Sequence, residues 1–207
     1  MAGDQIEQWE DLTTHQRHWI GSGGARPLRT VDGDGRNVIS FDGIDDLLAL
    51  SAGLPTLRPF SVGLVYRVRE RNDFTGILSA TPPAGTDHSE FWTFRNASAA
   101  SQQMQLFGRS IEADPLDLSL ADSGAAQVAV WSIGGGVAEL RDGSGSDSDT
   151  YGGSLGAPTG IVLGGRYAEA PFGHAAIDVL ATIGAARVLS TADQQRLIAW
   201  ATARWSL

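Results

Sequence analysis

Apolar and polar side chains alternate along FSVGLVYRVR, the segment from Phe60 to Arg69. Successive side chains of an extended chain point to opposite faces, so every second residue shares a face. A period of two predicts a half-buried β-strand rather than a helix. The apolar face of this segment consists of Phe60, Val62, Leu64, Tyr66 and Val68.

The same short pattern returns along most of the chain, interrupted by clusters of glycine, proline, serine and aspartate that favour turns. Many short strands at close spacing are typical of an all-β, two-sheet antiparallel β-sandwich. The 207 residues suffice for one sizeable core, and no repeat or linker divides them, so we expect a single domain over 1–207. Strands are expected at 37–41, 46–50, 60–69, 76–80, 90–96, 103–108, 126–133, 137–141, 160–164 and 175–183.

The C-terminal segment departs from this pattern. Ser190 is suited to cap a helix, and Asp193 follows three positions later, as in a capping box. Apolar residues then recur every four positions, which places them on one helical face. We therefore predict an amphipathic α-helix over about 190–205 that packs against the sandwich. The face in question carries Leu197, Ala201 and Trp205, and Trp200 joins it.

Charge and composition exclude several classes of protein. A net charge of −9, with fifteen arginines scattered singly and no lysine, argues against a nucleic-acid-binding surface. No cysteine is present, so disulfides and thiolate metal sites are excluded. The segment MAGDQIEQWEDL is acidic and lacks an apolar core, and we therefore expect no signal peptide. No apolar run approaches the roughly 18 residues of a membrane span.

Three aspartates are concentrated in ISFDGIDDLLAL, from Ile39 to Leu50. The pair Asp42-Gly43 is typical of a tight turn, where glycine takes a positive φ without strain. We expect Asp45 and Asp46 to resume the second strand, where adjacent side chains point to opposite faces. Joint acid–base chemistry by those two carboxylates is then excluded, and the segment is interpreted as a hairpin.

In order along the chain, four landmarks resemble the laminin-G-like, concanavalin A-like jelly-roll domains of bacterial and phage proteins. They are Trp9-x-Asp11, VISFDGIDDLLAL after Arg26-Pro27, Gly164-Gly165-Arg166 leading to Ile177-Asp178-Val179, and the terminal helix ending Arg204-Trp205-Ser206-Leu207. The resemblance implies a jelly-roll β-sandwich that works outside the cell on saccharides or proteins. It covers nearly the whole chain.

Related jelly-roll glycanases carry a Glu-x-Asp-x-x-Glu pattern on one strand, because two carboxyl groups must flank one glycosidic bond. No strand of this sequence carries that pattern. The histidines lie near no recognisable nucleophile motif. We therefore predict that the protein is not an enzyme. The alternative is a glycoside hydrolase-like enzyme whose carboxylates converge from loops.

Calcium is the one cofactor left open. It takes six to eight oxygen ligands, commonly from a loop rich in carboxylates. RDGSGSDSDTYGG, residues 141–153, offers three aspartates among serines and glycines, and we otherwise interpret it as a solvated acidic loop. The candidate metal ligands are Asp142, Asp147 and Asp149.

Sugars are commonly held by an exposed aromatic ring with polar groups at its edge. Loops favour exposure, so Tyr151, Arg166 and Tyr167 are the preferred ligand-facing residues. Trp92 is the fourth candidate, although aromatic residues within strands more often pack in the core, as we expect for Trp131.

Together these features predict a non-catalytic binding or structural module that binds glycans or docks on a protein assembly. An extracellular type of fold without a signal peptide suggests a virion surface protein, such as a decoration or tail protein. Such a protein is made in the host cytoplasm and leaves with the particle. Its expected partners are a glycan or the surface of a capsid or tail, with copies of itself on the particle, and neither nucleic acid nor membrane.

Overall fold

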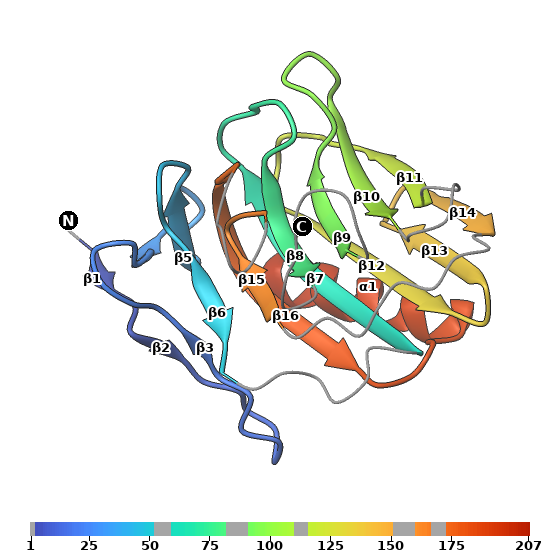
Figure 1. The fold of residues 1–207 in the computed structure, drawn as a ribbon, viewed down its shortest axis with the longest axis horizontal. Helices are drawn as coiled ribbons and strands as arrows, with labels where there is room; N and C mark the ends of the chain where they lie inside the picture. The colour runs from blue at the N-terminus through green and yellow to red at the C-terminus, as the bar shows by residue number, and fades with distance from the viewer. Residues whose placement is uncertain (1–2, 52–58, 82–90, 110–115, 151–159, 167–172) are drawn as a thin grey trace.

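A computed structural model of the protein describes residues 3–51, 59–81, 91–109, 116–150, 160–166 and 173–207. Their strands form two antiparallel sheets of eight strands each, and one helix lies at the C-terminal end of the chain (Figure 1). The expected two-sheet β-sandwich with a C-terminal helix is confirmed.

We name the two sheets A and B. In spatial order, sheet A consists of β1 (Asp4–Gln5), β4 (Leu28–Val31), β5 (Asn37–Asp42), β16 (Ala176–Ala185), β7 (Phe60–Val68), β12 (Gln127–Gly134), β13 (Val137–Arg141) and β14 (Ser146–Thr150). Sheet B consists of β11 (Leu116–Ala121), β10 (Gln103–Arg109), β9 (Phe91–Asn96), β8 (Gly76–Thr81), β15 (Gly160–Leu163), β6 (Leu48–Leu50), β3 (Trp19–Ile20) and β2 (Gln8–Trp9).

The segment FSVGLVYRVR forms β7 near the centre of sheet A, between β16 and β12. Its burial is not the simple alternation that a half-buried strand would show. Leu64 and Tyr66 enter the core between the sheets, but Val65 is buried as well, because the helix covers the other face. A strand covered on both faces carries mainly apolar or small residues on each of them, and the first charged residue of β7 is Arg67.

Six observed strands were not expected from the sequence: β1, β2, β3, β4, β11 and β14. The first three are two residues long, too short to display a period. β14 has the sequence SDSDT and lies at the edge of sheet A. An edge strand presents polar side chains to water, so its sequence resembles a loop. The interpretation of 141–153 as a loop is therefore wrong for residues 146–150.

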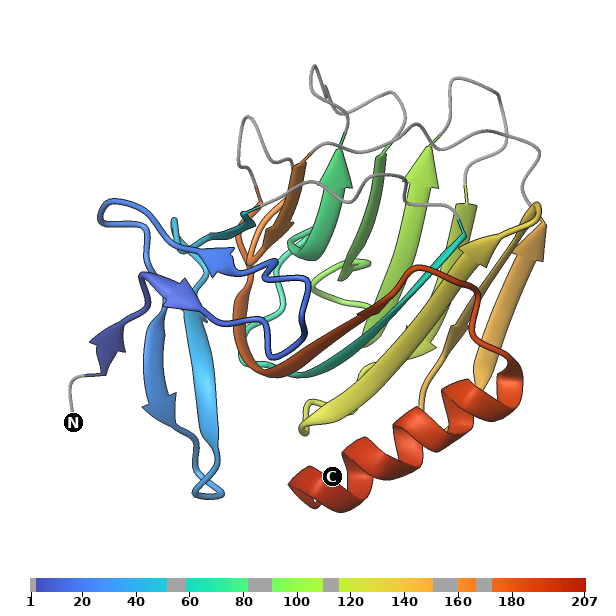
Figure 2. The same cartoon turned by 90° about the horizontal axis from the view of Figure 1, so that it is seen from below.

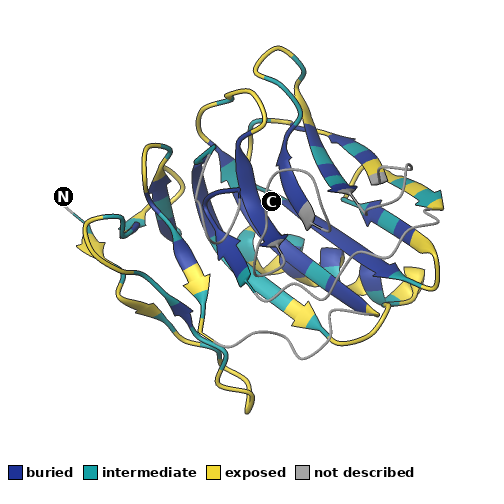
Figure 3. Cartoon of the chain, in the orientation of Figure 1, coloured by how far each residue is buried: buried dark blue, intermediate teal, exposed yellow. Residues whose placement is uncertain are grey.

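The main core fills the space between the two sheets. Trp131 and Phe94 are fully buried there, one on each sheet, which confirms the expected core position of Trp131. Figure 3 shows that burial is concentrated in the central strands, whereas the short N-terminal strands are largely exposed. The first three strands therefore contribute mainly Trp19 to the core, with Trp9 packed against it.

Helix α1 (Thr191–Trp205) crosses the face of sheet A that points away from sheet B (Figure 2). Ser190 caps it as expected, accepting a hydrogen bond from the Asp193 N–H. Ile198 and Ala201 pack on Val65 and its neighbours in a second apolar cluster. Trp200 was expected on this packed face but is 51% exposed, so that part of the prediction is wrong. Within the described ranges, no helix is long and apolar enough to cross a membrane.

Candidate functional site

The face of sheet B that points away from the core carries aromatic, arginine and amide side chains. On β9, Phe94 enters the core, so its neighbour Arg95 points outward. On β10, Leu106 enters the core, so Gln105 and Phe107 point outward. The strand register pairs Arg95 with Gln105, which brings these outward side chains together.

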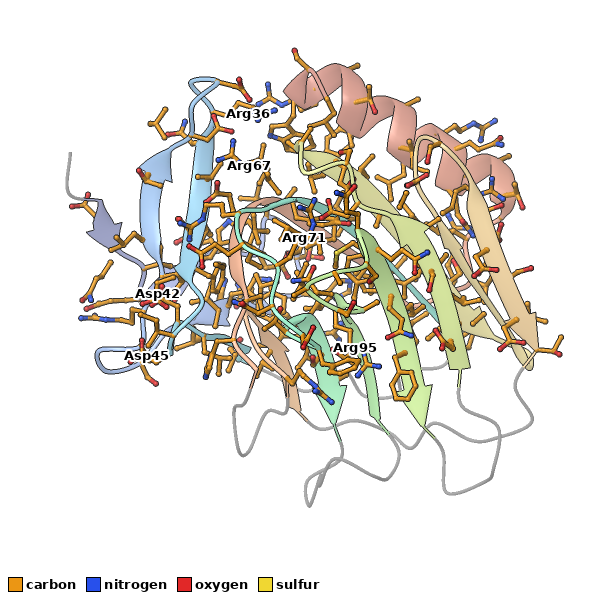
Figure 4. The ribbon with its side chains drawn as sticks, turned by 90° about the horizontal axis from the view of Figure 1, so that it is seen from above. Arg36, Asp42, Asp45, Arg67, Arg71 and Arg95 are labelled. Atoms are coloured by element: carbon orange, nitrogen blue, oxygen red, sulfur yellow. The ribbon has the colours of Figure 1, made fainter. Side chains whose placement is uncertain are left out.

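Arg95 lies between two aromatic rings. Its Cζ atom is 4.2 Å from the centroid of the Phe107 ring and 4.8 Å from that of Phe74. A guanidinium at this distance is attracted to the negative face of a ring. Arg95 Nε donates to Gln105 Oε1 at 2.8 Å, and Gln105 Nε2 donates to Asp117 Oδ1 at 2.5 Å. We call these five residues the Phe74 cluster; Figure 4 shows Arg95 on the side of the molecule away from the helix.

Phe74 is the exposed member of the cluster. Its side chain is 46% exposed, whereas that of Arg95 is nearly buried. Its φ of 55° places a bulky residue in the left-handed region, a strained conformation that is found mainly where the surrounding structure fixes it.

Hydrogen bonds to Phe74 and to the two residues that follow it fix this conformation. Asn96 N donates to Thr75 O at 3.0 Å, and Gly76 N donates to Gly173 O at 2.9 Å. Arg166 Nη1 donates to the carbonyl of Phe74 itself at 3.3 Å. The ring is therefore presented to solvent on a backbone that is already ordered.

Two of the four predicted ligand-facing residues, Tyr151 and Tyr167, lie outside the described residues. Trp92 belongs to β9, where its backbone pairs with Ala80 and Gly108. Arg166 was expected to be exposed but is buried, with 7% of its surface accessible, because its side chain lies against Gly76 and Gly173. A ligand-facing role for these residues stays a prediction, although Arg166 borders the Phe74 cluster.

The predicted calcium ligands Asp142, Asp147 and Asp149 do not converge on one point. Asp142 Oδ1 accepts from Ser144 N at 2.6 Å and from Gly145 N at 2.8 Å, which closes the turn between β13 and β14. Asp147 Oδ2 accepts from Ser119 N at 3.0 Å and so joins the edges of the two sheets. The first two carboxylates thus have structural partners, and a metal site at these three aspartates stays a prediction.

Within the described ranges, the carboxylates that do converge are Asp42, Asp45 and Asp46, the first of which appears with Asp45 in Figure 4. One oxygen from each lies within 4.8 Å of the others. The expectation that Asp45 and Asp46 point to opposite faces of a strand is wrong, because β6 begins only at Leu48. Both aspartates lie in the turn, where no strand alternation applies.

Asp46 is the buried member of this turn, with 6% of its surface accessible. Its Oδ2 accepts from the N–H of Asp42 at 2.8 Å, so the carboxylate closes the turn from inside. Burial raises the pKa of Asp46 above its ordinary value, and the carboxylates of Asp42 and Asp45 raise it further. The Asp42 N–H and the charge of Arg69 act in the opposite direction but do not cancel the rise.

Three carboxylates in one turn could supply part of the oxygen shell that Ca²⁺ requires, with backbone carbonyls or water completing it. The same turn is poorly suited to glycoside hydrolysis. That reaction needs two carboxyl groups on either side of a bond, about 5 to 9.5 Å apart, rather than three within one turn. The chemistry of the turn therefore favours cation binding over acid–base catalysis.

The Phe74 cluster was missed from the sequence. The alternation of β9 and β10 could have placed Arg95 and Phe107 on outward faces, but only the strand register shows that they meet. Phe74 comes from a loop of polar residues, RNDFT at 71–75, where a single aromatic residue carries no period. A lone bulky apolar residue in a polar loop was the one available signal.

No family model matches the sequence, and no curated protein sequence matches it. Solved structures do match. One match is domain 4 of AbnA, a GH43 extracellular arabinanase from Geobacillus stearothermophilus, solved with arabinotriose. The match covers 96% of this chain and 100% of that domain, with a TM-score of 0.68 and 15% identity. Another is the CBM40 of the Ruminococcus gnavus IT-sialidase bound to α2,3-sialyllactose. That match covers 70% of this chain and 83% of the CBM40 chain, with a TM-score of 0.57 and 13% identity.

The sialidase of Trypanosoma rangeli in complex with the inhibitor DANA is a third match, with a TM-score of 0.64 and 12% identity over 95% of this chain. The chain spans 31% of the length of that enzyme. At these identities the likeness shows the fold alone. This chain therefore has a β-sandwich fold similar to the folds of these domains.

Proposed function

We propose that the protein is a non-catalytic carbohydrate-binding module whose glycan ligand packs on the Phe74 cluster. One observation carries the proposal. Phe74 offers a half-exposed ring on an ordered backbone, with the amide of Gln105 and the carboxylate of Asp117 nearby. An apolar surface with a few fixed polar groups is the usual composition of a small-ligand site.

Chemical complementarity favours a saccharide as the ligand. The C–H face of a sugar ring is apolar and packs on an aromatic ring, while its hydroxyl groups pair with amides and carboxylates. Arg95 stacks under Phe74 and leaves no loose side chain to reorganise when the ligand arrives. Preorganisation of this kind reduces the entropy cost of binding. The saccharides named with two of the fold neighbours agree with this choice of ligand.

A glycan array probed with the purified protein, with calcium and with a chelator, tests the proposal. We expect specific glycans to bind. Phe74→Ala should then raise the dissociation constant at least tenfold, which corresponds to a loss of about 1.4 kcal/mol of binding free energy. Trp200→Ala is the matched control, because Trp200 is 51% exposed but lies on α1, on the other side of the molecule.

Two outcomes would count against the proposal. Binding of no glycan would favour docking on a protein assembly, the other role expected from the sequence. Equal affinities of the Phe74→Ala and Trp200→Ala variants would place the glycan elsewhere on the surface. A location on a virion, at a capsid or tail, stays a prediction, and mass spectrometry of purified particles would test it.

A further inference from the structure

A pocket of about 180 Å³ lies on the helix side of sheet A, remote from the Phe74 cluster. Its lining comes from the β4–β5 hairpin, from β7, from the loop before β12 and from the C-terminal end of the chain after α1. A cavity of about 150 Å³ admits a molecule of the size of benzene. The pocket is therefore large enough for one small organic molecule. Its lining includes Asp34, Arg36, Arg67, Ala125, Ser206 and Leu207.

Arg67 contributes a guanidinium with unused donors to this pocket. Its Nη2 lies 3.2 Å from Oδ2 of Asp178 in an ion pair. Among the described residues, no group accepts a well-aligned hydrogen bond from the N–H groups of Arg67. The side chain is 29% exposed. A guanidinium carries five N–H donors in a planar fork that matches a carboxylate. Arg67 thus keeps most of its donors for a ligand.

Arg67 shares its one carboxylate partner with a second arginine. Asp178, which is buried, is shared between Arg67 and Arg69, whose Nε lies 3.1 Å from its second oxygen. One carboxylate thus serves two guanidinium groups, so it neutralises the charge of Arg67 only in part.

Arg36, the other arginine of the pocket, is fully engaged. Its guanidinium pairs with Asp32 at 2.7 Å and with Asp34 at 2.5 Å. Its Nη1 also donates to the carbonyl of Trp205 at 3.2 Å, which joins the hairpin to the end of the helix. Arg36 therefore has a structural role, and Arg67 is the group that can bind a ligand. Figure 4 shows both arginines beside the helix.

We propose that this pocket binds a small ligand bearing one carboxylate, which pairs with the fork of Arg67. A singly charged group fits better than a phosphate dianion, because Asp34 stands at the rim and the protein carries a net charge of −9. The apolar part of the ligand would lie against Ala125 and Leu207. The carboxylate could belong to an acidic sugar or to a free organic acid, and these share the same recognition chemistry.

NMR titration of ¹⁵N-labelled protein with glucuronate, acetate and glucose tests the proposal, with the amides of residues 124–126 as reporters. Glucuronate and acetate should shift these signals, and glucose, which has the same ring without the carboxylate, should not. Tighter binding of glucuronate than of acetate would identify an acidic sugar as the ligand. Equal binding would identify a small organic acid.

Arg67→Gln should weaken glucuronate binding at least about tenfold. Arg196→Gln removes the same charge from a side chain on α1 that is 81% exposed, and it should leave binding unchanged. Ala125→Phe fills the pocket from an exposed position while keeping Arg67, so it should also abolish binding. Thermal melts of each variant check the fold.

The proposal is overturned if neither carboxylate shifts the reporter amides at tens of millimolar, or if Arg67→Gln and Arg196→Gln bind alike. Equal binding of glucose and glucuronate would also overturn it. The Phe74→Ala variant should bind glucuronate as the unmodified protein does, because Phe74 lies on the other sheet. Failure of glycan binding at the Phe74 cluster and failure of carboxylate binding at Arg67 can thus be told apart.

Discussion

Trp131 of sheet A stacks on Phe94 of sheet B, with ring centroids 5.0 Å apart and an interplanar angle of 21°. Neither side chain has any accessible surface. Tyr66 meets the Phe94 ring edge-on at 5.5 Å, so three aromatic side chains join the two sheets at the centre of the sandwich. Stacked and edge-on pairs of this kind contribute about 0.5–1.5 kcal/mol beyond their buried area.

Phe94→Ala should lower the free energy of unfolding by about 3–5 kcal/mol, since it removes a large buried ring and leaves a cavity. Urea denaturation monitored by tryptophan fluorescence measures the change. Val137→Ala shortens an apolar side chain that is 46% exposed and should change stability by less than about 0.5 kcal/mol. Similar losses for both variants would show that the stack does not hold the sheets together.

The sequence predicts the central strands of this fold because burial imposes a period on them. Ile39 and Phe41 on β5, like Leu64 and Tyr66 on β7, lie two positions apart in the core, and this spacing reveals the strands. The edge strand SDSDT has no such constraint and was taken for a loop. Burial imposes no period on the Phe74 cluster either, because the cluster depends on the register of β9 and β10 and on the backbone conformation of Phe74. The Asp42–Asp46 turn was recognised as a hairpin, but the burial of Asp46 was not.

Gly164 follows β15 with a φ of +96°, a conformation that residues with a side chain rarely adopt. A Cβ atom there would lie 2.4 Å from the ring of Phe41, which is fully buried. Gly164→Ala should therefore destabilise the protein by several kcal/mol, through both strain and overpacking.

Gly143 is the matched control for Gly164, because a Cβ atom there would meet nothing within 4 Å and its φ is not positive. Thermal unfolding followed by circular dichroism compares the two alanine variants. If Gly164→Ala melts at the same temperature as Gly143→Ala, the close approach of the Gly164 backbone to Phe41 is not present in solution.

Asp11 organises the loop between β2 and β3. Its carboxylate accepts from the Arg17 N–H and from the hydroxyl and N–H of Thr13, and these bonds lower its pKa from 3.8 to about 2. Because the pKa is lower in the folded state, the contribution of Asp11 to stability is present above pH 3.8 and is lost as the pH falls through 2.

A ¹³C NMR titration of the carboxyl groups should give Asp11 a pKa near 2. Thr13→Ala removes one of the three hydrogen bonds and should raise that pKa part of the way to its ordinary value. A pKa of 3.8 in the unmodified protein would mean that the loop is not closed around Asp11 in solution.

Asp46 has the opposite sign of pH dependence. Its pKa is raised on folding, first by burial and then by the nearby carboxylates, so the folded state holds a proton that the unfolded state releases. The contribution to stability is present below pH 3.8 and is lost as the pH rises through the folded pKa. Asp46→Asn keeps an oxygen to accept from the Asp42 N–H but carries no charge.

The difference in unfolding free energy between Asp46→Asn and the unmodified protein should therefore be small near pH 3.5 and should favour the variant increasingly towards pH 7. Urea denaturation at a series of pH values measures this difference directly, and effects of other titrating groups largely cancel in it. Glu10→Gln, which removes one negative charge from an exposed side chain, controls for the change in net charge. A difference that stays constant with pH would mean that folding does not change the pKa of Asp46. A difference that increasingly favours aspartate towards neutral pH would mean that the carboxylate is stabilised in its charged form, as it would be beside a bound cation.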